Sequence, residues 1–367
     1  MNSQPSSIIP VCRPLLPTTA ELAPYLARVD AQRWYSNFGP LNTELTQRLA
    51  THAGAQVEHV VTAANATAAL TCVMLDYANP EGGPRPRALM PAWTFVATPQ
   101  AATLAGLEPY FADVDPVSWQ ITPAIARSAV ATSDIPVAVV VVVGPFGAPV
   151  ETADWEDFAA ETGIAVIIDA AAGFDSVAAS KLTTVVSLHA TKALPAGEGA
   201  FVLCRSEAEA IRLKRRQNFG FHGSRTAEIA ALNAKMSEYH AAVGLAALDQ
   251  WTARRAGYAR ALATYRRHLP GNRALMPDGL GTGWITATMV IALERAREAA
   301  AMLFSHGIET RAWWADGCHL HPAFTACPRT SLPATRILAD TTLGLPLSLD
   351  LPDTDIEWIC GLIAGAA

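Results

Sequence analysis

Lysine is rare in this chain, and one of its four lysines lies between two apolar segments in a small, glycine-rich stretch. The stretch runs from Ser187 to Cys204 and reads SLHATKALPAGEGAFVLC, with Lys192 inside it. The other 23 of the 27 basic residues are arginines. A surface position is the usual fate of a lysine. Beside buried strands, however, desolvation would lower the pKa of Lys192 and leave a neutral amine that can form a Schiff base. The GEG that follows would let the backbone approach a bound molecule.

A second candidate for chemistry is a carboxylate at the end of an apolar segment. The segment IAVIIDAAAG predicts a strand that ends at Asp169. Ligands of open parallel sheets bind just outside the carboxyl ends of the strands. Asp169 can therefore hold a cationic ring nitrogen, or it can simply cap the next element. It lies 23 residues before Lys192, with one strand-like segment between them, so both side chains can face one crevice.

A third candidate is the start of a predicted helix. The stretch AANATAAL, from Ala63 to Leu70, follows the predicted strand VEHVVT. Small residues at a helix start leave free N–H groups and a favourable dipole for a phosphate. Asn65 or Thr67 can equally be an ordinary helix cap, so this pattern is weak by itself.

Together these features are the parts that pyridoxal phosphate requires, namely an amine, a partner for the ring nitrogen and a phosphate site. The stretch PAWTFVATPQAA adds Trp93, whose indole could stack on the cofactor ring or pack in the core. His189 and Glu198 could be catalytic or could brace the segment around Lys192. His319 and His321 are too weak a pattern to indicate zinc, and we expect no metal.

The elements that must position these residues alternate between strand and helix from about residue 55 to 205. Several strand-like runs, such as IPVAVVVVV, are apolar throughout, which is typical of strands covered on both faces. Helical patterns lie between them, which predicts a mainly parallel α/β sheet with helices on both faces. After residue 233 the spacing predicts a long helix or a helix pair, and the last hundred residues indicate a small α+β domain. We therefore expect a large α/β domain over residues 1–250 and a small one over 251–367.

Composition excludes several classes of protein. The chain has 367 residues, 51% of them hydrophobic, and a net charge of −6, which disfavours a nucleic-acid binder. Its longest uncharged run is too short and too interrupted by glycine and proline to span a membrane. The first residues show no signal-peptide pattern, and the six scattered cysteines fit a reducing compartment, so we expect a cytoplasmic protein.

These motifs resemble those of the DegT/DnrJ/EryC1/StrS family, the pyridoxal-phosphate aminotransferases of sugar and cyclitol metabolism. The stretch SLHATKALPAGEGAF is similar to the family pattern S-F-H-x-T-K-x-L-x-x-G-E-G-G. Also similar are ATAAL, PAWTFVATPQAATLAGLEPYFADVD and LNAKMSEYHAAVGLAAL, so the resemblance covers nearly the whole chain. It implies the aspartate-aminotransferase fold (fold type I) and a homodimer with shared active sites.

The resemblance also implies a role for each matching residue. Lys192 would link the cofactor and shuttle a proton, and Asp169 would pair with the ring nitrogen. Trp93 would stack on the ring. The cofactor phosphate would be bound by the backbone of Ala66, the side chains of Thr67 and Ser187, and Asn233 of the other subunit.

Some positions depart from the family pattern. Ala172 replaces a glutamine that lies beside the cofactor ring, and the family's Arg-Met pair is here Lys235-Met236. Neither change touches Lys192, which dehydratases of the superfamily replace with histidine, so transamination is favoured.

The resulting hypothesis is transfer of an amino group from glutamate to a keto group of a nucleotide-linked deoxysugar. The alternatives are a cyclitol aminotransferase and a non-catalytic regulatory protein that binds the cofactor. For the substrate we consider His222, Arg225 and His319. The basic stretch RRQNFGFHGSR could cover a diphosphate or could be an ordinary solvated charge run.

Overall fold

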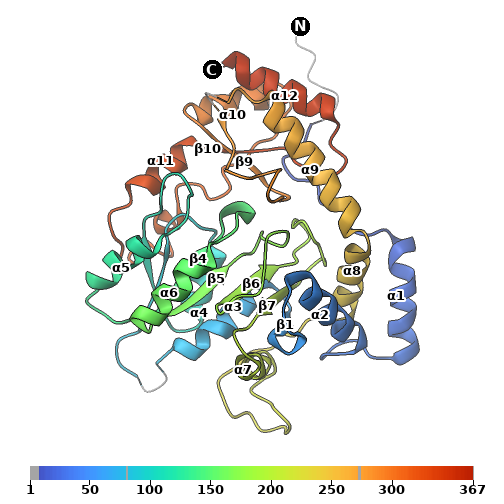
Figure 1. Cartoon of the computed structure of the whole chain (residues 1–367), viewed down its shortest axis with the longest axis vertical. Coiled ribbons are helices and arrows are strands. Elements are labelled where there is room, and N and C mark those ends of the chain that lie inside the picture. The colour runs from blue at the N-terminus through green and yellow to red at the C-terminus, as the bar shows by residue number, and fades with distance from the viewer. Residues whose placement is uncertain (1–7, 80–81, 272–273, 367) are drawn as a thin grey trace.

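Two β-sheets of unequal size organise the chain in the computed structural model, which describes residues 8–79, 82–271 and 274–366. Figure 1 shows the larger sheet in the lower part of the molecule and the smaller sheet, with helices around it, in the upper part. Residues 1–7, where the sequence shows no signal-peptide pattern, lie outside the described residues, as do 272–273 of the predicted linker.

The larger sheet has seven strands in the order β1-β7-β6-β5-β4-β2-β3. Its strands β2 to β6 run parallel to one another, whereas β7 runs antiparallel to both of its neighbours, β1 and β6. The expected mainly parallel α/β sheet is therefore confirmed. The strands are β1 Val60–Ala63, β2 Arg87–Pro91, β3 Glu108–Ala112, β4 Val137–Val143, β5 Ala165–Asp169, β6 Thr183–Ser187 and β7 Ala200–Leu203.

Helices cover both faces of this sheet because its central strands are apolar on both sides. Successive side chains of a strand point to opposite faces. In β4, Val140 and Val142 join one buried cluster, and Val139 and Val141 join another on the opposite face. The helices of this part are α1 Thr19–Gln32, α2 Pro40–Ala53, α3 Ala66–Met74, α4 Ala97–Leu104, α5 Pro123–Ala131, α6 Thr152–Thr162, α7 Glu207–Gln217 and α8 Glu238–Asp249.

The predicted long helix or helix pair is a pair, since α8 ends at Asp249 and α9 spans Trp251–His268. The chain then forms the smaller antiparallel sheet, β8 Ala274–Leu275, β9 Met289–Leu293 and β10 Thr342–Leu345, in the order β10-β9-β8. The remaining helices are α10 Ala296–Ser305, α11 Pro333–Thr341 and α12 Asp353–Ala366. Short 3₁₀ turns lie at Val57–His59, Leu75–Tyr77, Pro145–Gly147 and Cys318–Leu320.

The first described residues lie against this C-terminal part. Ile9 forms a bridge with Ile308, and Cys12 forms one with Leu347. The predicted domain boundary at residue 250 falls between α8 and α9 and stays a prediction. The N-terminal segment, which we assigned to the large domain, contacts residues of the predicted C-terminal domain. Within the described residues, no helix is both long enough and apolar enough to cross a membrane.

Candidate active site

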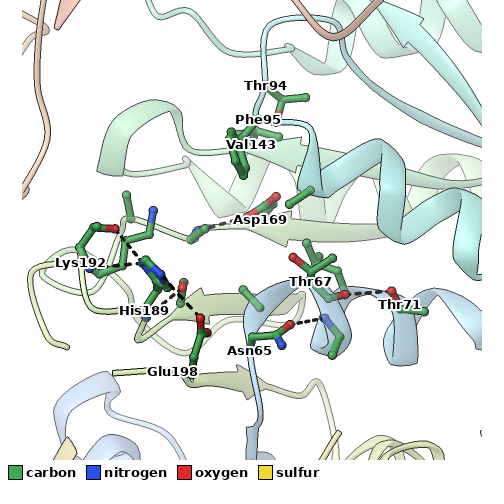
Figure 2. A pocket seen from close by; sticks show the side chains of 18 of the residues that line it. Asn65, Thr67, Thr71, Thr94, Phe95, Val143, Asp169, His189, Lys192 and Glu198 are labelled. Atoms are coloured by element: carbon green, nitrogen blue, oxygen red, sulfur yellow. Dashed lines mark hydrogen bonds and ion pairs between the residues drawn. The ribbon is translucent and has the colours of Figure 1, made fainter. Parts of the chain in front are cut away.

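A large pocket opens where the carboxyl ends of β4, β5 and β6 meet the start of α3. Its volume is about 1170 Å³. Asp169 and Lys192 both line it, so the structure brings the two principal candidates together. Figure 2 shows Asp169 at the sheet edge, Lys192 on one side and Asn65 with Thr67 at the start of α3. The C-terminal part contributes Arg311, Trp313 and Trp314 to the wall.

Asp169 is a buried carboxyl group held by two neutral donors. Its side chain accepts hydrogen bonds from Thr98 Oγ1 at 2.8 Å and from the Ala171 amide at 3.2 Å. Burial raises its pKa, and these donors and the positive charge of Lys192 counteract the rise. Because burial disfavours an isolated carboxylate, a cationic group bound beside Asp169 would stabilise its charged form.

Lys192 reaches the same pocket from the loop after β6. Desolvation lowers its pKa, while the nearby Asp169 and Cys12 act in the opposite direction. Its backbone amide donates to the His189 carbonyl at 2.9 Å, which holds the residue in a tight turn. A lowered pKa makes the neutral amine available nearer to neutral pH, which is the state that attacks a carbonyl carbon.

His189 and Glu198 brace this turn. The Thr191 amide donates to His189 Nδ1 at 3.3 Å, so Nδ1 is an acceptor and the ring proton belongs on Nε2. Nε2 lies 3.6 Å from Glu198 Oε1. The neighbouring glycines also serve the turn and its packing, and the expected close approach of their backbone to a ligand stays a prediction. Gly197 has a φ of +80°, and a Cβ at Gly199 would lie 2.6 Å from Met236 Cε.

The start of α3 has the features of an anion site. Asn65 is the helix cap, because its side chain accepts from the Ala68 amide at 2.8 Å. The amides of Ala66 and Thr67 have no acceptor in the part of the chain that the structure describes. Ser187, at the end of β6, lines the same pocket. Free amides, hydroxyls and the helix dipole together favour a phosphate group here.

Trp93 does not line the pocket, so the structure does not place it where it could stack on a bound ring. It is 1% exposed and packs edge-on against Trp314, with ring centroids 5.3 Å apart. Its side chain turns into the core because the chain leaves the extended conformation after β2. Phe95, two residues further on, is 56% exposed and lines the pocket. Phe95, unlike Trp93, is therefore an aromatic residue available to a ligand, as are Phe146, Trp313 and Trp314 elsewhere in the pocket wall.

Asn233 is exposed and does not line the pocket of its own chain. Its side-chain oxygen accepts a hydrogen bond from Lys235 Nζ at 2.7 Å. The three preceding residues, 230–232, do line the pocket. A contact between Asn233 and a phosphate of the other subunit stays a prediction.

The three substrate candidates also lie outside this pocket. His222 and Arg225 are exposed. His319 is buried beside a separate cavity of about 280 Å³ with Arg329 and Arg336, and burial and both arginines lower its pKa. Their substrate roles stay predictions.

Two arginines of the predicted diphosphate loop already have acidic partners. Arg215 pairs with Glu228 at 3.1 Å, and Arg216 pairs with Asp76 at 3.0 Å. Their charges are thus partly neutralised within the chain, which favours the interpretation of this stretch as an ordinary charge run.

Sequence reasoning missed several residues of the pocket. Thr98 supports Asp169 from α4, and Phe146 lines the pocket in a left-handed conformation with a φ of +53°. Cys12 and Arg311 come from opposite ends of the chain. For Thr98 and Phe95 the signal lay in the stretch PAWTFVATPQAA itself, but no local pattern indicated Cys12 or Arg311.

The donor set of the pocket fits pyridoxal phosphate. The amine of Lys192, the buried carboxyl group of Asp169 and the open helix start match the aldehyde, the ring nitrogen and the phosphate of that cofactor. Among the described residues, no group of three or more His, Cys, Asp or Glu side chains is arranged to hold a metal ion.

Comparison with known proteins identifies relatives along nearly the entire length. Residues 18–364 match the model of the DegT/DnrJ/EryC1/StrS aminotransferase family. The chain is 30% identical over 278 residues to a dTDP-4-amino-4,6-dideoxy-D-glucose transaminase of Shigella dysenteriae, which covers 73% of each protein. It is 29% identical to protein Rv3402c of Mycobacterium tuberculosis, over 98% of this chain and 90% of that protein.

Solved structures show the same architecture. DesI, crystallised in the presence of its TDP-sugar product, superposes with a TM-score of 0.84 at 31% identity, covering 97% of this chain and 92% of DesI. A Bacillus cereus protein assigned as a PLP-dependent aminotransferase superposes with a TM-score of 0.90 at 28% identity, covering 98% and 100%.

Proposed function

The chain belongs to the DegT/DnrJ/EryC1/StrS aminotransferase family, and on that premise we propose that it transfers the amino group of glutamate to a keto group of a nucleotide-linked deoxysugar. It is a pyridoxal-phosphate-dependent aminotransferase with sugar transaminases among its relatives. The observation that carries the proposal is the meeting of Lys192, Asp169 and the start of α3 in one pocket. The names of DesI and of the Shigella relative support the nucleotide-linked sugar.

The residues at the sheet edge and at the start of α3 each have a place in this reaction. Bound pyridoxal phosphate supplies an electron sink for the bond that breaks at the amino-acid Cα. Lys192 Nζ would hold the cofactor covalently and, once free, would be the base that takes the proton from the amino-acid Cα. Asp169, whose side chain accepts a hydrogen bond from Thr98 Oγ1, would pair with the ring nitrogen and favour its protonated form. The amides of Ala66 and Thr67 and the hydroxyl of Ser187 would bind the phosphate and so keep the cofactor in place.

The apolar wall of the pocket favours one kind of keto substrate. Ala172, which replaces the glutamine of the family pattern, lines the pocket beside Ala171. Phe146 and Trp314 stack with their centroids 4.1 Å apart and line it as well. A surface of this kind suits the less polar face of a deoxysugar, which has fewer hydroxyl groups than a full sugar.

Two half-reactions test the proposed function. Purified protein loaded with pyridoxal phosphate should lose its visible absorption when L-glutamate is added and regain it with the correct keto-sugar nucleotide. Screening dTDP- and UDP-linked 3-keto and 4-keto deoxysugars by mass spectrometry of the aminated product would identify the acceptor. Regeneration by a keto-inositol alone would favour the cyclitol alternative, and cofactor binding without either half-reaction would favour a regulatory protein.

Phe95 should contribute more to cofactor binding than Trp93. Phe95→Ala removes an aromatic face from the pocket and should weaken cofactor binding about fivefold, in line with roughly 1 kcal/mol for an aromatic contact. Trp93→Phe changes a residue outside the pocket wall and should lower thermal stability while leaving cofactor affinity near that of the wild type. Titration with pyridoxal phosphate and thermal melts of both variants measure the two effects. If only Trp93→Phe lost affinity for pyridoxal phosphate, Trp93 rather than Phe95 would be the residue that stacks on the cofactor ring.

Mixed dimers test the proposed role of Asn233 in the site of a second subunit. Asn233 is exposed in its own chain, so an amide there is free to reach a partner's phosphate. Lys192→Ala and Asn233→Ala protomers should each have little activity alone. After subunit exchange, one site of each mixed dimer contains both wild-type residues and should recover activity, up to about half of the wild-type value per mixed dimer. Proven exchange without recovery would mean that Asn233 acts only within its own chain.

A further inference from the structure

A second cavity lies apart from the active-site pocket, and the proposed reaction does not use it. Its volume is about 280 Å³, and its wall is formed by His319 and Leu320 together with residues 329–332 and Arg336. None of these residues lines the pocket of Lys192. A water molecule takes up about 30 Å³ of the liquid, so the cavity has room for a small molecule.

The wall carries two arginines that form no ion pair in the described part of the chain. Arg329 Nη1 donates to the His319 carbonyl at 3.2 Å, whereas the Arg336 guanidinium has no hydrogen-bonding partner among the described residues. Both arginines are exposed, so their N–H donors are accessible. Like charges held near one another repel, and an anion bound beside them would remove that repulsion.

His319 adds a buried donor to the two cations. It is 4% exposed, and its Nδ1 is buried without a hydrogen-bonding partner among the described residues. A buried N–H without an acceptor is more costly than an unused lone pair, so the ring proton belongs on Nε2. Nε2 also has no partner within the described chain, yet it is not enclosed as Nδ1 is. Nε2 is therefore the ring atom that can donate to a molecule in the cavity.

Two acidic side chains, Asp113 and Asp316, partly offset the lowered pKa of this histidine, but both already have other partners. Asp113 accepts from the Ala334 and Thr335 amides, each at 2.8 Å, and so caps α11. Asp316 lies 3.7 Å from Arg297. The two arginines of the cavity wall thus remain available to an anion from outside the chain.

Backbone hydrogen bonds hold the segments that form this wall. The Phe111 amide donates to the Pro328 carbonyl at 3.0 Å, and the Thr330 amide donates to the Phe111 carbonyl at 2.9 Å. This segment therefore runs along β3, the edge strand of the large sheet. The Cys318 amide donates to the Ala92 carbonyl at 2.8 Å, which fixes the turn that carries the histidine. Segments held in this way need little further ordering when a ligand binds.

We propose that this cavity binds the phosphate group of a small molecule, separately from the cofactor and the keto substrate. Guanidinium forks match phosphate oxygens in a bidentate arrangement, and two forks with an imidazole N–H surround a tetrahedral dianion better than a flat carboxylate. A carboxylate has only two oxygens, which one arginine can satisfy. Leu320 and Leu332 line the same cavity and suit the organic part of a phosphate monoester.

Calorimetry on the cofactor-loaded protein tests this site, because bound pyridoxal phosphate already occupies the proposed phosphate site at α3. The probes are inorganic phosphate and phenyl phosphate, titrated near neutral pH at constant ionic strength. We expect a Kd of about 1 mM or lower for at least one of them. Arg329→Gln and Arg336→Gln should each raise this Kd about 10- to 100-fold, as expected for loss of a charged hydrogen-bonding group. Arg336→Lys, which keeps the charge but loses the fork, should give an intermediate value.

Two further variants separate a specific site from general attraction by positive charge. Arg267→Gln is the matched control, because it removes an exposed arginine of α9 that lines neither cavity, and it should bind both probes like the wild type. His319→Phe keeps a ring of similar shape but removes the N–H donor, so its Kd should rise about threefold to tenfold. Thermal melts and the visible absorption of the bound cofactor show whether each variant is folded.

The outcomes also distinguish the possible sources of the phosphate. Tighter binding of phenyl phosphate than of inorganic phosphate would support a monoester as the ligand, and equal affinities would support free phosphate. Failure of both probes to bind, or unchanged affinity in both glutamine variants at the cavity arginines, would overturn the inference. Succinate bound as tightly as phosphate would overturn it in favour of carboxylates. Weaker dTDP binding in the same two variants would assign the cavity to the nucleotide of the substrate and overturn a separate site.

Discussion

Lys192→Ala should abolish transamination, with activity falling below about one thousandth of the wild-type value. The protein would lose both the covalent anchor of the cofactor and the amine that moves the proton. Cofactor should still bind through the phosphate site at the start of α3, but without the visible absorption of the covalent form. Borohydride reduction followed by peptide mapping should place the label on Lys192 in the wild-type protein. Label on Lys181, Lys214 or Lys235 instead would contradict the assignment.

Stability measurements show whether loss of activity in this variant reflects unfolding. Burial lowers the pKa of Lys192 below the value of 10.5 that it has when exposed, so the unfolded chain binds a proton that the folded chain releases. Without cofactor, wild-type stability should therefore fall as the pH decreases from about 10.5 through the folded-state pKa. The alanine variant lacks this penalty, so its stability relative to the wild type should increase in the same direction. Lys181→Ala, on an 88% exposed side chain, is the matched control and should be fully active.

Asp169→Asn should reduce the rate of the glutamate half-reaction about 10²- to 10³-fold, comparable to loss of one preorganised stabilising group. Asparagine is isosteric with aspartate, and its oxygen can still accept from Thr98 Oγ1 or the Ala171 amide. The fold should therefore persist, while a neutral amide cannot keep the ring nitrogen protonated. Single-turnover absorbance measurements with glutamate give the rate directly.

Two further variants accompany Asp169→Asn, one at the residue that supports Asp169 and one at a surface carboxylate. Thr98→Val leaves the Asp169 charge but removes the 2.8 Å hydrogen bond that orients it, so an intermediate rate and an altered pH profile are expected. Asp249→Asn, which disrupts a surface pair with Arg48, should react like the wild type. A wild-type rate in Asp169→Asn would mean that another group supports the ring nitrogen.

Local sequence determined the sheet and the chemistry at its edge. Every residue of β4 is apolar, which is why the sequence predicted helices on both faces of the sheet. Asp169 ends β5, and Lys192 follows β6 by a short turn, so the edge of a parallel sheet brings them together. The side-chain alternation within a strand and the alternation of strands with helices obey short-range rules, and such rules can be read along a sequence.

Tertiary structure decided which neighbouring side chain faces the pocket. Trp93 and Phe95 are two residues apart, and an extended chain would point both to the same side. The chain bends after β2, so Trp93 enters the core against Trp314 while Phe95 remains exposed to the pocket. The direction of a side chain in a bend depends on the packing around it, which no local pattern encodes.

Residues distant in the sequence became part of the site only through packing of the C-terminal part on the large sheet. Cys12 and Arg311 are almost 300 positions apart, yet both line the pocket of Lys192. Sequence alone predicted that an amine, a carboxyl group and a helix start suited to a phosphate belong to one site. Which arginine lines that pocket was decided by long-range contacts, because the backbone pairing of Arg311 with Gly344 and its contact with Trp313 exist only in the folded chain.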